Sequence, residues 1–204
     1  MGLYNRYILP HVVNLACSGK PTMRQRQKVV PRATGRVLEI GFGSGLNLPF
    51  YEAGAVQKLW ALEPSEEMWA LAEPGMSASP LPIEPVLSGA EDIPLATNSV
   101  DTVMLTYTLC SIAEPETALR EILRVLSDGG RLIFCEHGEA PDPGVKRWQQ
   151  RINPLWKRFG GGCHLDRPIP DLIENAGFRI NGLETMYLPG WKPASFNYWG
   201  EART

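Results

Sequence analysis

The stretch VLEIGFGSGLN joins an apolar run to three glycines, Gly41, Gly43 and Gly45, each separated from the next by one residue. A glycine-rich turn after a buried strand lets the backbone come close to a ligand. No lysine follows these glycines, which excludes the phosphate-binding pattern G-x-x-x-x-G-K-[ST]. Leu46 stands where the nicotinamide-dinucleotide pattern G-x-G-x-x-G has its third glycine, which counts against that ligand as well.

Two glutamates stand beside this turn. Glu39 precedes the first glycine by two residues, where its carboxylate can hold either the loop or an amino group of a ligand. Glu63 ends the next apolar run, 18 positions after Gly45. A carboxylate at the end of the second strand of such a unit can accept hydrogen bonds from both hydroxyls of a ribose. The alternative is a solvated glutamate that caps the next helix, so Glu63 favours a nucleoside ligand without naming it.

The elements that must position these residues alternate between two kinds of pattern. Short, continuous apolar runs predict buried strands. These runs cover 36–40, 58–63, 82–87, 100–107 and 130–137, followed by two late strands at 179–188 and 194–200. Amphipathic segments between the runs predict helices over 64–73, 115–130, 144–160 and 169–178, with Ser65 as an N-cap. We therefore expect an α/β, Rossmann-like, doubly wound and mostly parallel seven-stranded sheet with helices on both faces.

An acidic residue followed by G-x-G-x-G resembles the motif of the class I S-adenosylmethionine-dependent methyltransferases. The stretch GAEDIPLATNSVDTVMLTYTLCSI (89–112) and the stretch LREILRVLSDGGRLIF (119–134) are similar to further parts of that family. The group that includes the ubiquinone/menaquinone C-methyltransferases shares these features. A narrower likeness, carried by GSGLNLPFY, TLCSI and WQQRINPLWKRFGGGCHLDR, is to thiol S-methyltransferases of animal membranes and their bacterial relatives.

This resemblance implies S-adenosylmethionine as the cofactor. Its adenine would lie beside Ala90 and Glu91, while Gly89 stands where many relatives carry aspartate. The full set of residues that the resemblance assigns to the cofactor is Glu39, Gly41, Phe42, Gly43, Gly45, Asn47, Glu63, Pro64, Met68, Ala90, Glu91 and Thr106. The animal proteins carry an N-terminal membrane anchor, and we do not expect their membrane location to apply to this chain.

Methyl transfer from a sulfonium is an in-line displacement, so the protein must align the two reactants and exclude water. We expect the acceptor pocket at the carboxyl ends of the first, fourth and fifth strands, with Tyr107 and His137 as catalytic candidates. His137 is the candidate base, although the favoured interpretation is that it binds a loop carbonyl and orders the segment after it. A thiol acceptor needs little base strength, because a thiol of pKa ~8.5 is partly ionised at neutral pH.

The predicted acceptor is a small lipophilic molecule, with a thiol ahead of a phospholipid amine or a quinone precursor. The basic helix 144–160 has a solvated face or, in a sharper interpretation, contacts lipid headgroups, and Pro154 is expected to interrupt it. Candidates for a lid over the pocket are Tyr4, Tyr7, Trp148, Arg151 and Trp156. The alternatives from other classes are a nicotinamide oxidoreductase and a regulatory protein that binds S-adenosylmethionine without catalysis.

Composition narrows the remaining questions. A net charge of −2 disfavours nucleic acid as the main partner. Four scattered cysteines without a C-x-x-C pair favour reduced thiols and a cytoplasmic protein. We expect Cys110 and Cys135 to be buried neutral thiols, and the adjacent Cys163 and His164 to form no metal site. The first 19 residues read poorly as a signal peptide, so we expect them to belong to the mature fold.

With 204 residues, the chain is long enough for one domain with a sizeable core. Within it we predict four parts in order along the chain: an N-terminal helical cap over 1–34, a cofactor-binding core over 35–137, an insertion over 138–168 that forms part of the acceptor site, and a C-terminal helix with strands over 169–204.

Overall fold

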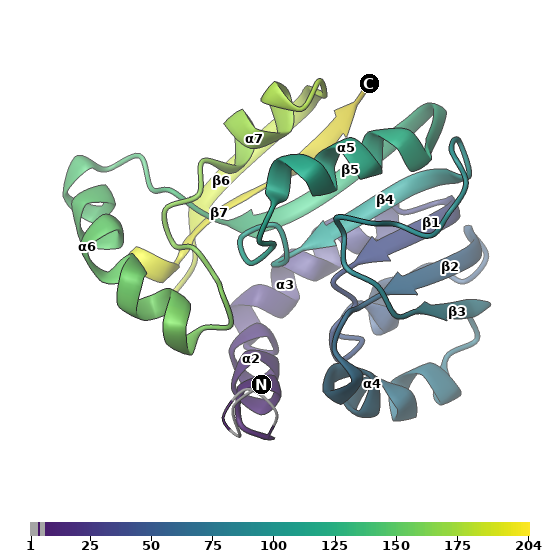
Figure 1. Cartoon of the computed structure of the whole chain (residues 1–204), viewed down its shortest axis with the longest axis horizontal. Coiled ribbons are helices and arrows are strands. Elements are labelled where there is room, and N and C mark those ends of the chain that lie inside the picture. Colours follow the sequence, from purple (N-terminus) through teal and green to yellow (C-terminus); the bar gives the residue numbers. More distant parts are fainter. Residues whose placement is uncertain (1–3, 5–6) are drawn as a thin grey trace.

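The computed structural model describes residue 4 and residues 7–204, so residues 1–3 and 5–6 of the predicted N-terminal cap lie outside the described residues. It contains a seven-stranded sheet of order β3-β2-β1-β4-β5-β7-β6 (Figure 1). The strands are β1 (Gly35–Ile40), β2 (Val56–Leu62), β3 (Ile83–Val86), β4 (Val100–Thr106), β5 (Leu126–His137), β6 (Arg179–Tyr187) and β7 (Phe196–Arg203). β1 to β5 run parallel, and β7 is antiparallel to both of its neighbours. The predicted doubly wound α/β fold is confirmed.

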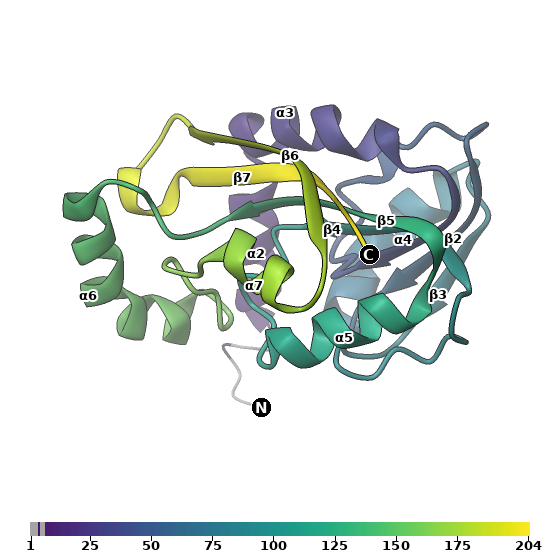
Figure 2. The same ribbon diagram turned by 90° about the horizontal axis from the view of Figure 1, so that it is seen from above.

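Helices cover both faces of this sheet. In chain order they are α2 (Leu9–Cys17), α3 (Lys20–Val29), α4 (Glu66–Ala78), α5 (Pro115–Val125), α6 (Pro143–Phe159) and α7 (Ile169–Asn175), with short turns η1 (Val30–Arg32), η2 (Leu48–Phe50) and η3 (Lys192–Ala194). Figure 2 shows α3 on one side of the sheet and α5 and α7 on the other. None of the helices in the described part of the chain is long and apolar enough to cross a bilayer.

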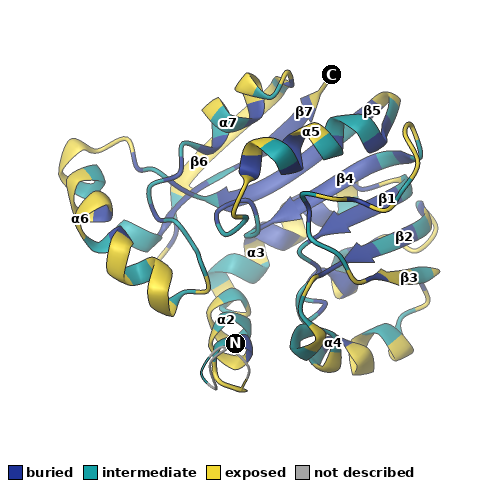
Figure 3. Cartoon of the chain, viewed as in Figure 1, coloured by how far each residue is buried: buried dark blue, intermediate teal, exposed yellow. Residues whose placement is uncertain are grey.

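Two hydrophobic cores lie on the two faces of the central strands, which are almost fully buried (Figure 3). Leu38 and Ile40 of β1 pack towards α5 and α7, while Val37 packs towards α3. β4 divides its side chains in the same way, with Leu105 on the first face and Met104 on the second. This alternation follows from the two-residue period of a strand, and it explains why these runs are apolar throughout.

The largest differences from the predicted helix ends are at α4 and α5, and α7 also ends early, at Asn175. α4 continues to Ala78 and includes Pro74, although its predicted N-cap is confirmed, because the Ser65 side chain accepts a hydrogen bond from the Met68 N–H. α5 ends at Val125, before the predicted stop, because Leu126 already pairs with Val100 as part of β5. Tertiary pairing therefore decides this boundary over the local glycine signal.

Pro154 does not interrupt α6, which runs through it from Pro143 to Phe159, so that expectation was wrong. Two buried amide side chains that precede the proline hold the helix to the rest of the fold. Gln149 accepts a hydrogen bond from the Ala140 N–H at 2.9 Å, and Asn153 accepts one from the Leu165 N–H at 3.0 Å. These tertiary bonds offset the intrahelical bond that the proline lacks.

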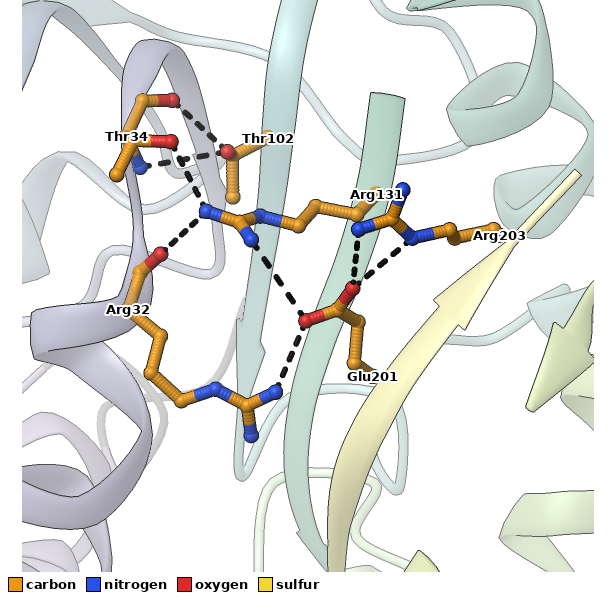
Figure 4. Close-up of polar contacts among 6 residues, drawn as sticks. All are labelled: Arg32, Thr34, Thr102, Arg131, Glu201 and Arg203. Carbon is orange, nitrogen blue, oxygen red and sulfur yellow. Dashed lines mark hydrogen bonds and ion pairs between the residues drawn. The ribbon is translucent and has the colours of Figure 1, made fainter. Parts of the chain in front are cut away.

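A charged network closes the amino end of the parallel strands (Figure 4). Glu201 of β7 is 8% exposed, and it accepts hydrogen bonds from Arg32 at 2.9 Å and from Arg203 at 2.9 and 3.0 Å. Arg131 of β5 forms an ion pair with the same carboxylate at 3.8 Å and donates to Thr34 Oγ1 at 2.9 Å. Burial raises the pKa of Glu201, but the three guanidinium groups outweigh it and hold the pKa below its usual value.

The sheet order places a crevice at the opposite end. The chain moves outwards from β1 through β2 to β3, and then returns to β4 on the other side of β1. In open α/β sheets, ligands bind beyond the carboxyl ends of the strands at such a switch point. The turns after β1, β2, β4 and β5 all meet there.

Candidate active site

A cavity of about 960 Å³ opens at the carboxyl ends of β1, β4 and β5, where the acceptor pocket was expected. Its walls include Ile40, Thr106 and His137, which lie at the ends of these three strands. The turn after β1, α2 and the end of α6 also contribute to its walls.

The glycine turn after β1 is tight for steric reasons. Gly41, Gly43 and Gly45 have φ angles of 69°, 57° and 77°, which side-chain-bearing residues rarely adopt. A Cβ added at Gly41 would lie 2.3 Å from the side chain of Thr108, and one at Gly43 would lie 3.2 Å from Met68 Cε. The turn after β1 therefore packs directly against the turn after β4, and glycine is needed for that contact.

Glu63 lies at the end of β2, faces the cavity and is 8% exposed. Its two carboxylate oxygens accept hydrogen bonds from the Gly43 N–H at 2.9 Å and the Ser65 N–H at 3.0 Å. Burial raises the pKa of Glu63, and these two backbone bonds oppose the rise. Each oxygen retains a second lone pair for a further donor.

Glu39 lies behind the turn, 1% exposed, and is outside the cavity wall. It accepts hydrogen bonds from Asn47 Nδ2 at 2.9 Å and from the Tyr51 hydroxyl at 2.7 Å. Burial raises its pKa to about 7, against the Tyr51 and Asn47 bonds and the positive charge of Arg26. Of the two roles considered for Glu39, the structure shows the one that holds the loop.

Arg26 of α3 is a cavity residue that the sequence did not reveal. It is 5% exposed, and its Nη1 donates to Asn47 Oδ1 at 2.8 Å and to Thr106 Oγ1 at 2.7 Å. Its guanidinium carbon lies 5.2 Å from the centre of the Tyr107 ring. Its buried Nε has no hydrogen-bond partner within residue 4 and residues 7–204. An unsatisfied buried donor on a cavity wall is suited to an anionic ligand group.

The predicted cofactor residues divide into two sets. Those that line the cavity are Gly41, Phe42, Gly43, Glu63, Pro64, Met68, Ala90, Glu91 and Thr106. Glu39, Gly45 and Asn47 do not line it and instead support the turn from behind. Gly89 also lines the cavity, beside Glu91, whose carboxylate accepts a hydrogen bond from the Glu114 N–H at 3.4 Å.

Tyr107 faces the cavity with a backbone φ of 56°, an unusual value for an aromatic residue. Its hydroxyl donates to Asn197 Oδ1 at 2.8 Å, and burial raises its pKa well above the usual value. The hydroxyl therefore stays protonated at neutral pH and acts as a hydrogen-bond donor. Strained backbone of this kind is concentrated at functional sites.

His137 does not bind a loop carbonyl. Its Nε2 lies 3.0 Å from the sulfur of Cys163, which also accepts a hydrogen bond from Trp156 Nε1 at 3.3 Å. Cys110 lies beside them, so that its sulfur, the Cys163 sulfur and the ring nitrogen all lie within 4.8 Å of one another. The Cys110 thiol, then His137 and Trp156, lower the pKa of Cys163 to about 4, despite its burial.

The other thiols behave as expected. Cys110 and Cys135 are buried, and burial raises the pKa of Cys135 to about 12. A hydrogen bond to Cys163 and burial raise that of Cys110 well above its usual value. None of the four cysteines, all of which are described, forms a disulfide.

The N-terminal helix closes one side of the cavity. Asn14 of α2 accepts a hydrogen bond from the Ser44 hydroxyl at 2.6 Å, which ties α2 to the glycine turn. Tyr4 lines the cavity and donates to the carbonyl of Phe159 at 2.8 Å. Of the other predicted lid residues, Trp156 lines this cavity. Trp148 and Arg151 face a separate surface hollow, and the exposed Tyr7 is absent from the cavity wall.

Comparison with known proteins identifies the family. The methyltransferase-domain family matches residues 38–134. The chain is 34% identical over 192 residues to human thiol S-methyltransferase TMT1B, an alignment that covers 91% of this chain and 78% of that protein. The chain belongs to the S-adenosylmethionine-dependent methyltransferases. The rat thiol S-methyltransferase TMT1B is 35% identical to this methyltransferase over 166 residues, 79% of this chain and 65% of that protein.

Relatives that match less of this methyltransferase are named for other acceptors. A demethylmenaquinone methyltransferase from Clavibacter sepedonicus is 32% identical over 119 residues, 58% of this chain and 48% of that protein. A phosphatidylethanolamine N-methyltransferase from Cereibacter sphaeroides is 31% identical over 124 residues, 59% of each chain. All of these relatives are named methyltransferases, but their names give different acceptors.

Solved structures give the same fold. An S-adenosylmethionine-dependent methyltransferase from Thermotoga maritima superposes with a TM-score of 0.70 at 21% identity, covering 98% of both chains. The [4+2]-cyclase SpnF superposes at 0.68 with 18% identity, covering 89% of this chain and 79% of that one. One fold therefore carries different chemistry, and the acceptor of this methyltransferase must be argued from its cavity.

The residues present fit S-adenosylmethionine. Glu63 offers free lone pairs for ribose hydroxyls, the three glycines add no side chains to the turn, and Arg26, whose buried Nε is unsatisfied among the described residues, lines the same cavity. Sequence reasoning missed Arg26 and the pairing of Cys163 with His137, because their partners are 21 and 26 residues or more away in the chain. Local spacing carries no signal for either contact.

Proposed function

We propose that the chain transfers a methyl group to the thiol of a small lipophilic molecule. Two observations support this acceptor. The relatives that match most of this chain are named thiol S-methyltransferases. The cavity is also framed by apolar side chains at its open end: Val12 of α2, Phe159 of α6 and Trp191 before η3 all line it while remaining about half exposed.

The cofactor would be held in the half of the cavity between β1 and β3. We propose that Glu63 accepts from the ribose hydroxyls and that Ala90 and Glu91 lie beside the adenine. The unsatisfied Arg26 Nε is suited to the carboxylate of the methionine portion, because a charged pair there would satisfy a buried donor. When bound, S-adenosylmethionine supplies a methyl group that is already activated on a sulfonium.

The acceptor would enter the other half of the cavity, beside Tyr107 and His137. The Tyr107 hydroxyl, fixed by Asn197, orients a polar group of the acceptor, and the apolar walls exclude water. A thiol acceptor needs little help with its proton, since its own pKa of ~8.5 leaves part of it ionised. The base role of His137 stays a prediction, because its Nε2 already contacts the Cys163 sulfur.

A matched acceptor panel tests this proposal. An alkyl thiol, the alcohol of the same chain length and the corresponding amine are incubated with S-adenosylmethionine, and methylated products are quantified. We expect the thiol to be methylated fastest, and a longer alkyl chain to lower its KM. Methylation of the alcohol or amine at the same rate as the thiol would remove the proposal. A reaction containing heat-denatured protein controls for uncatalysed transfer.

A second candidate is an amine or ring carbon of a membrane lipid, in the manner of the phospholipid and quinone relatives by name. α6 supports it, because Leu155 and Phe159 are 65% and 55% exposed on a helix that also carries Arg151, Lys157 and Arg158. Such a face suits contact with an anionic bilayer surface. Sedimentation with vesicles of anionic lipid, compared with neutral ones, tests the contact. Product analysis after the addition of phosphatidylethanolamine tests the chemistry.

The remaining parts of the proposal concern organisation and location. We propose that residues 1–34 and 138–168 complete the acceptor site around the 35–137 core, within a single domain that continues over 169–204. The cavity wall supports this, because α2 and the end of α6 both contribute to it. We also propose a cytoplasmic location, supported by four free cysteines.

A further inference from the structure

We propose that Cys110, His137 and Cys163 bind a thiophilic divalent metal ion, such as Zn²⁺, in the acceptor half of the cavity. The sequence offers no metal-ligand spacing for these residues, because they lie 26 or more positions apart. Cys163 and His164 are adjacent, but the structure pairs Cys163 with His137 instead. Metal binding itself does not depend on the proposed function. A role for the ion in holding the acceptor thiol would depend on it.

The spacing of the three donor atoms suits such an ion. The two sulfurs and the imidazole nitrogen all lie within 4.8 Å of one another, and Nε2 and the Cys163 sulfur are 3.0 Å apart. Tetrahedral bonds of about 2.3 Å to sulfur and 2.0 Å to nitrogen separate sulfur from nitrogen by about 3.5 Å and sulfur from sulfur by about 3.8 Å. The shortest side must therefore lengthen by about half an ångström, and a side as long as 4.8 Å must shorten by about 1 Å.

The loop that carries Cys110 is held in place before any ion binds. The buried carboxylate of Glu136 accepts hydrogen bonds from the N–H groups of Thr108, Leu109 and Cys110 at 2.7, 3.0 and 3.4 Å. The Cys110 carbonyl accepts a bond from the His164 N–H at 2.8 Å, which fixes the two cysteine loops to each other. Rigid placement of ligands reduces the entropy lost on binding.

The other two ligands are equally well positioned. His137 ends β5 and pairs with Asn197 of β7. The turn before Cys163 is shaped by Gly161 and Gly162, with φ angles of 64° and 84°, and Trp156 Nε1 donates to the Cys163 sulfur at 3.3 Å. An N–H donor to a sulfur ligand is the kind of outer contact that orients metal ligands.

The fold makes no other polar use of the His137 ring. Its Nδ1 is buried and has no hydrogen-bond partner in the part of the chain that the structure describes, so the only polar contact of the ring is to Cys163. A buried imidazole that contributes so little to the fold requires another explanation. Coordination of Nε2 by an ion gives the imidazole a role and keeps its proton on Nδ1.

The charge around the cluster is close to balanced. Glu136 accepts a hydrogen bond from the Cys110 N–H, and Arg167 donates to the carbonyl of the preceding residue, Leu109. Two thiolates and a neutral imidazole add two negative charges, which a divalent ion cancels. A set of two cysteines and one histidine leaves a fourth position open, as in catalytic zinc sites. All three residues line the cavity, so that fourth position faces the acceptor space.

Cobalt provides the most direct test, because thiolate-to-Co²⁺ charge transfer gives an absorption band that reports sulfur ligands. The full chain, reduced and freed of metal with a chelator, is titrated with Co²⁺ and then with Zn²⁺ in the absence of cofactor and acceptor. We expect one Co²⁺ per chain with a thiolate charge-transfer band, which Zn²⁺ abolishes by displacement. No band at a saturating Co²⁺ concentration overturns the proposal.

Variants assign the ligands. We expect C163S and H137Q each to weaken Co²⁺ binding by at least about tenfold. The control C135S, which changes a buried cysteine outside the cluster, should retain the wild-type affinity. Thermal unfolding of each metal-free variant verifies folding, and equal losses in C135S and C163S overturn the assignment. Because no acceptor is present, failure here leaves the thiol assay unaffected, and failure of that assay leaves this result unaffected.

Discussion

Two buried glutamates at opposite ends of the same sheet have pKa values shifted in opposite directions. Glu201, at the amino end of the parallel strands, faces three arginines, and its pKa lies below the usual value (Figure 4). Glu39, at the carboxyl end, accepts from two neutral donors, and burial raises its pKa to about 7. Burial acts on both groups but is more complete at Glu39, which is 1% exposed against 8% for Glu201, so burial and the partners both contribute to the difference.

The comparison distinguishes the amino end of the parallel strands, where the polar side chains are paired, from their carboxyl end at the cavity. We call the carboxyl end the working end. At the amino end, one carboxylate is shared by three guanidinium groups, and these contacts tie η1, β5 and β7 together. At the carboxyl end, Arg26 Nε and His137 Nδ1 are buried without partners among the residues that the structure describes, and Tyr107 is strained. Incomplete polar satisfaction beside a cavity is typical of a ligand site.

The largest expected change in the free energy of unfolding comes from filling the tight contact at the glycine turn. We expect Gly41→Ala to destabilise the fold by about 3 kcal/mol or more, because a Cβ at a φ of 69° would lie 2.3 Å from Thr108. Gly129→Ala is the matched control, with a φ of 76° and no atom within 4 Å of the added Cβ. It should cost only the backbone strain of about 1–2 kcal/mol. Urea unfolding of both variants measures the difference, and equal losses would contradict the packing account.

The pH dependence of stability should differ in sign between the two glutamates. Glu39 has a folded pKa of about 7 against an ordinary value of 4.5. As pH rises from about 4.5 to 7, the unfolded chain loses this proton before the folded one does. Stability therefore falls, on the order of 3 kcal/mol in total. Glu39→Gln should remove this fall, because an amide retains hydrogen bonds to Tyr51 and Asn47 without ionising.

Glu201 should show the reverse. Its pKa is lowered in the folded state, so its contribution is present above the ordinary value of 4.5 and is lost as pH falls below it. Glu201→Gln should flatten the stability curve on the acid side only. Free energies of unfolding across pH, taken as variant minus wild type, isolate each group from the others that titrate. Slopes of the same sign in the two variants would refute the comparison.

Ligand affinity should respond only at the working end. We expect Glu63→Gln to weaken S-adenosylhomocysteine binding by about 10–100-fold, since charge-assisted hydrogen bonds contribute about 1.5–3 kcal/mol. Glu201→Gln, which alters a glutamate of the same 8% exposure, is the control and should bind as the wild type does. Isothermal titration calorimetry measures both. Unchanged affinity in Glu63→Gln would remove that residue from the cofactor site.

The smallest expected effect is the stability cost of Glu201→Gln itself. Its three arginine partners are 42%, 23% and 46% exposed, so solvent screens much of their charge. We expect a loss of about 1–2 kcal/mol at pH 7, below the cost of breaking a fully buried pair. Urea denaturation with and without 0.5 M salt checks the electrostatic origin of this loss. At that salt concentration the Debye length is roughly a few ångströms. Salt should reduce the difference between variant and wild type.

The sequence predicted the frame of the molecule better than its site. Continuous apolar runs located the strands, because burial on both faces requires apolar residues throughout. The turn at Gly41–Gly45 located the crevice, because positive φ angles favour glycine. The end of α5 and the course of α6 through Pro154 were missed, since pairing of Leu126 and the buried amides of Gln149 and Asn153 decide them. These contacts are tertiary and leave no local pattern.

In the site, the place of Glu63 on the cavity wall at the end of β2 could be predicted, because a single strand end determines it, and its role with the ribose stays a prediction. Arg26 and the cluster of Cys110, His137 and Cys163 could not. Their geometry arises only when α3, two loops and the end of β5 come together. The acceptor half of the cavity is assembled from such distant pieces, which is also why related chains with the same cofactor are named for different acceptors.

The central claim is that the working end of this methyltransferase presents a thiol to its cofactor. A single competition measures it: an equimolar mixture of an alkyl thiol, its alcohol and its amine is incubated with S-adenosylmethionine carrying a deuterated methyl group. Mass spectrometry then identifies which product gains the label. The account predicts a labelled thioether in large excess over the labelled ether and amine. Label in the amine or the alcohol, with the thiol unmodified, would contradict it.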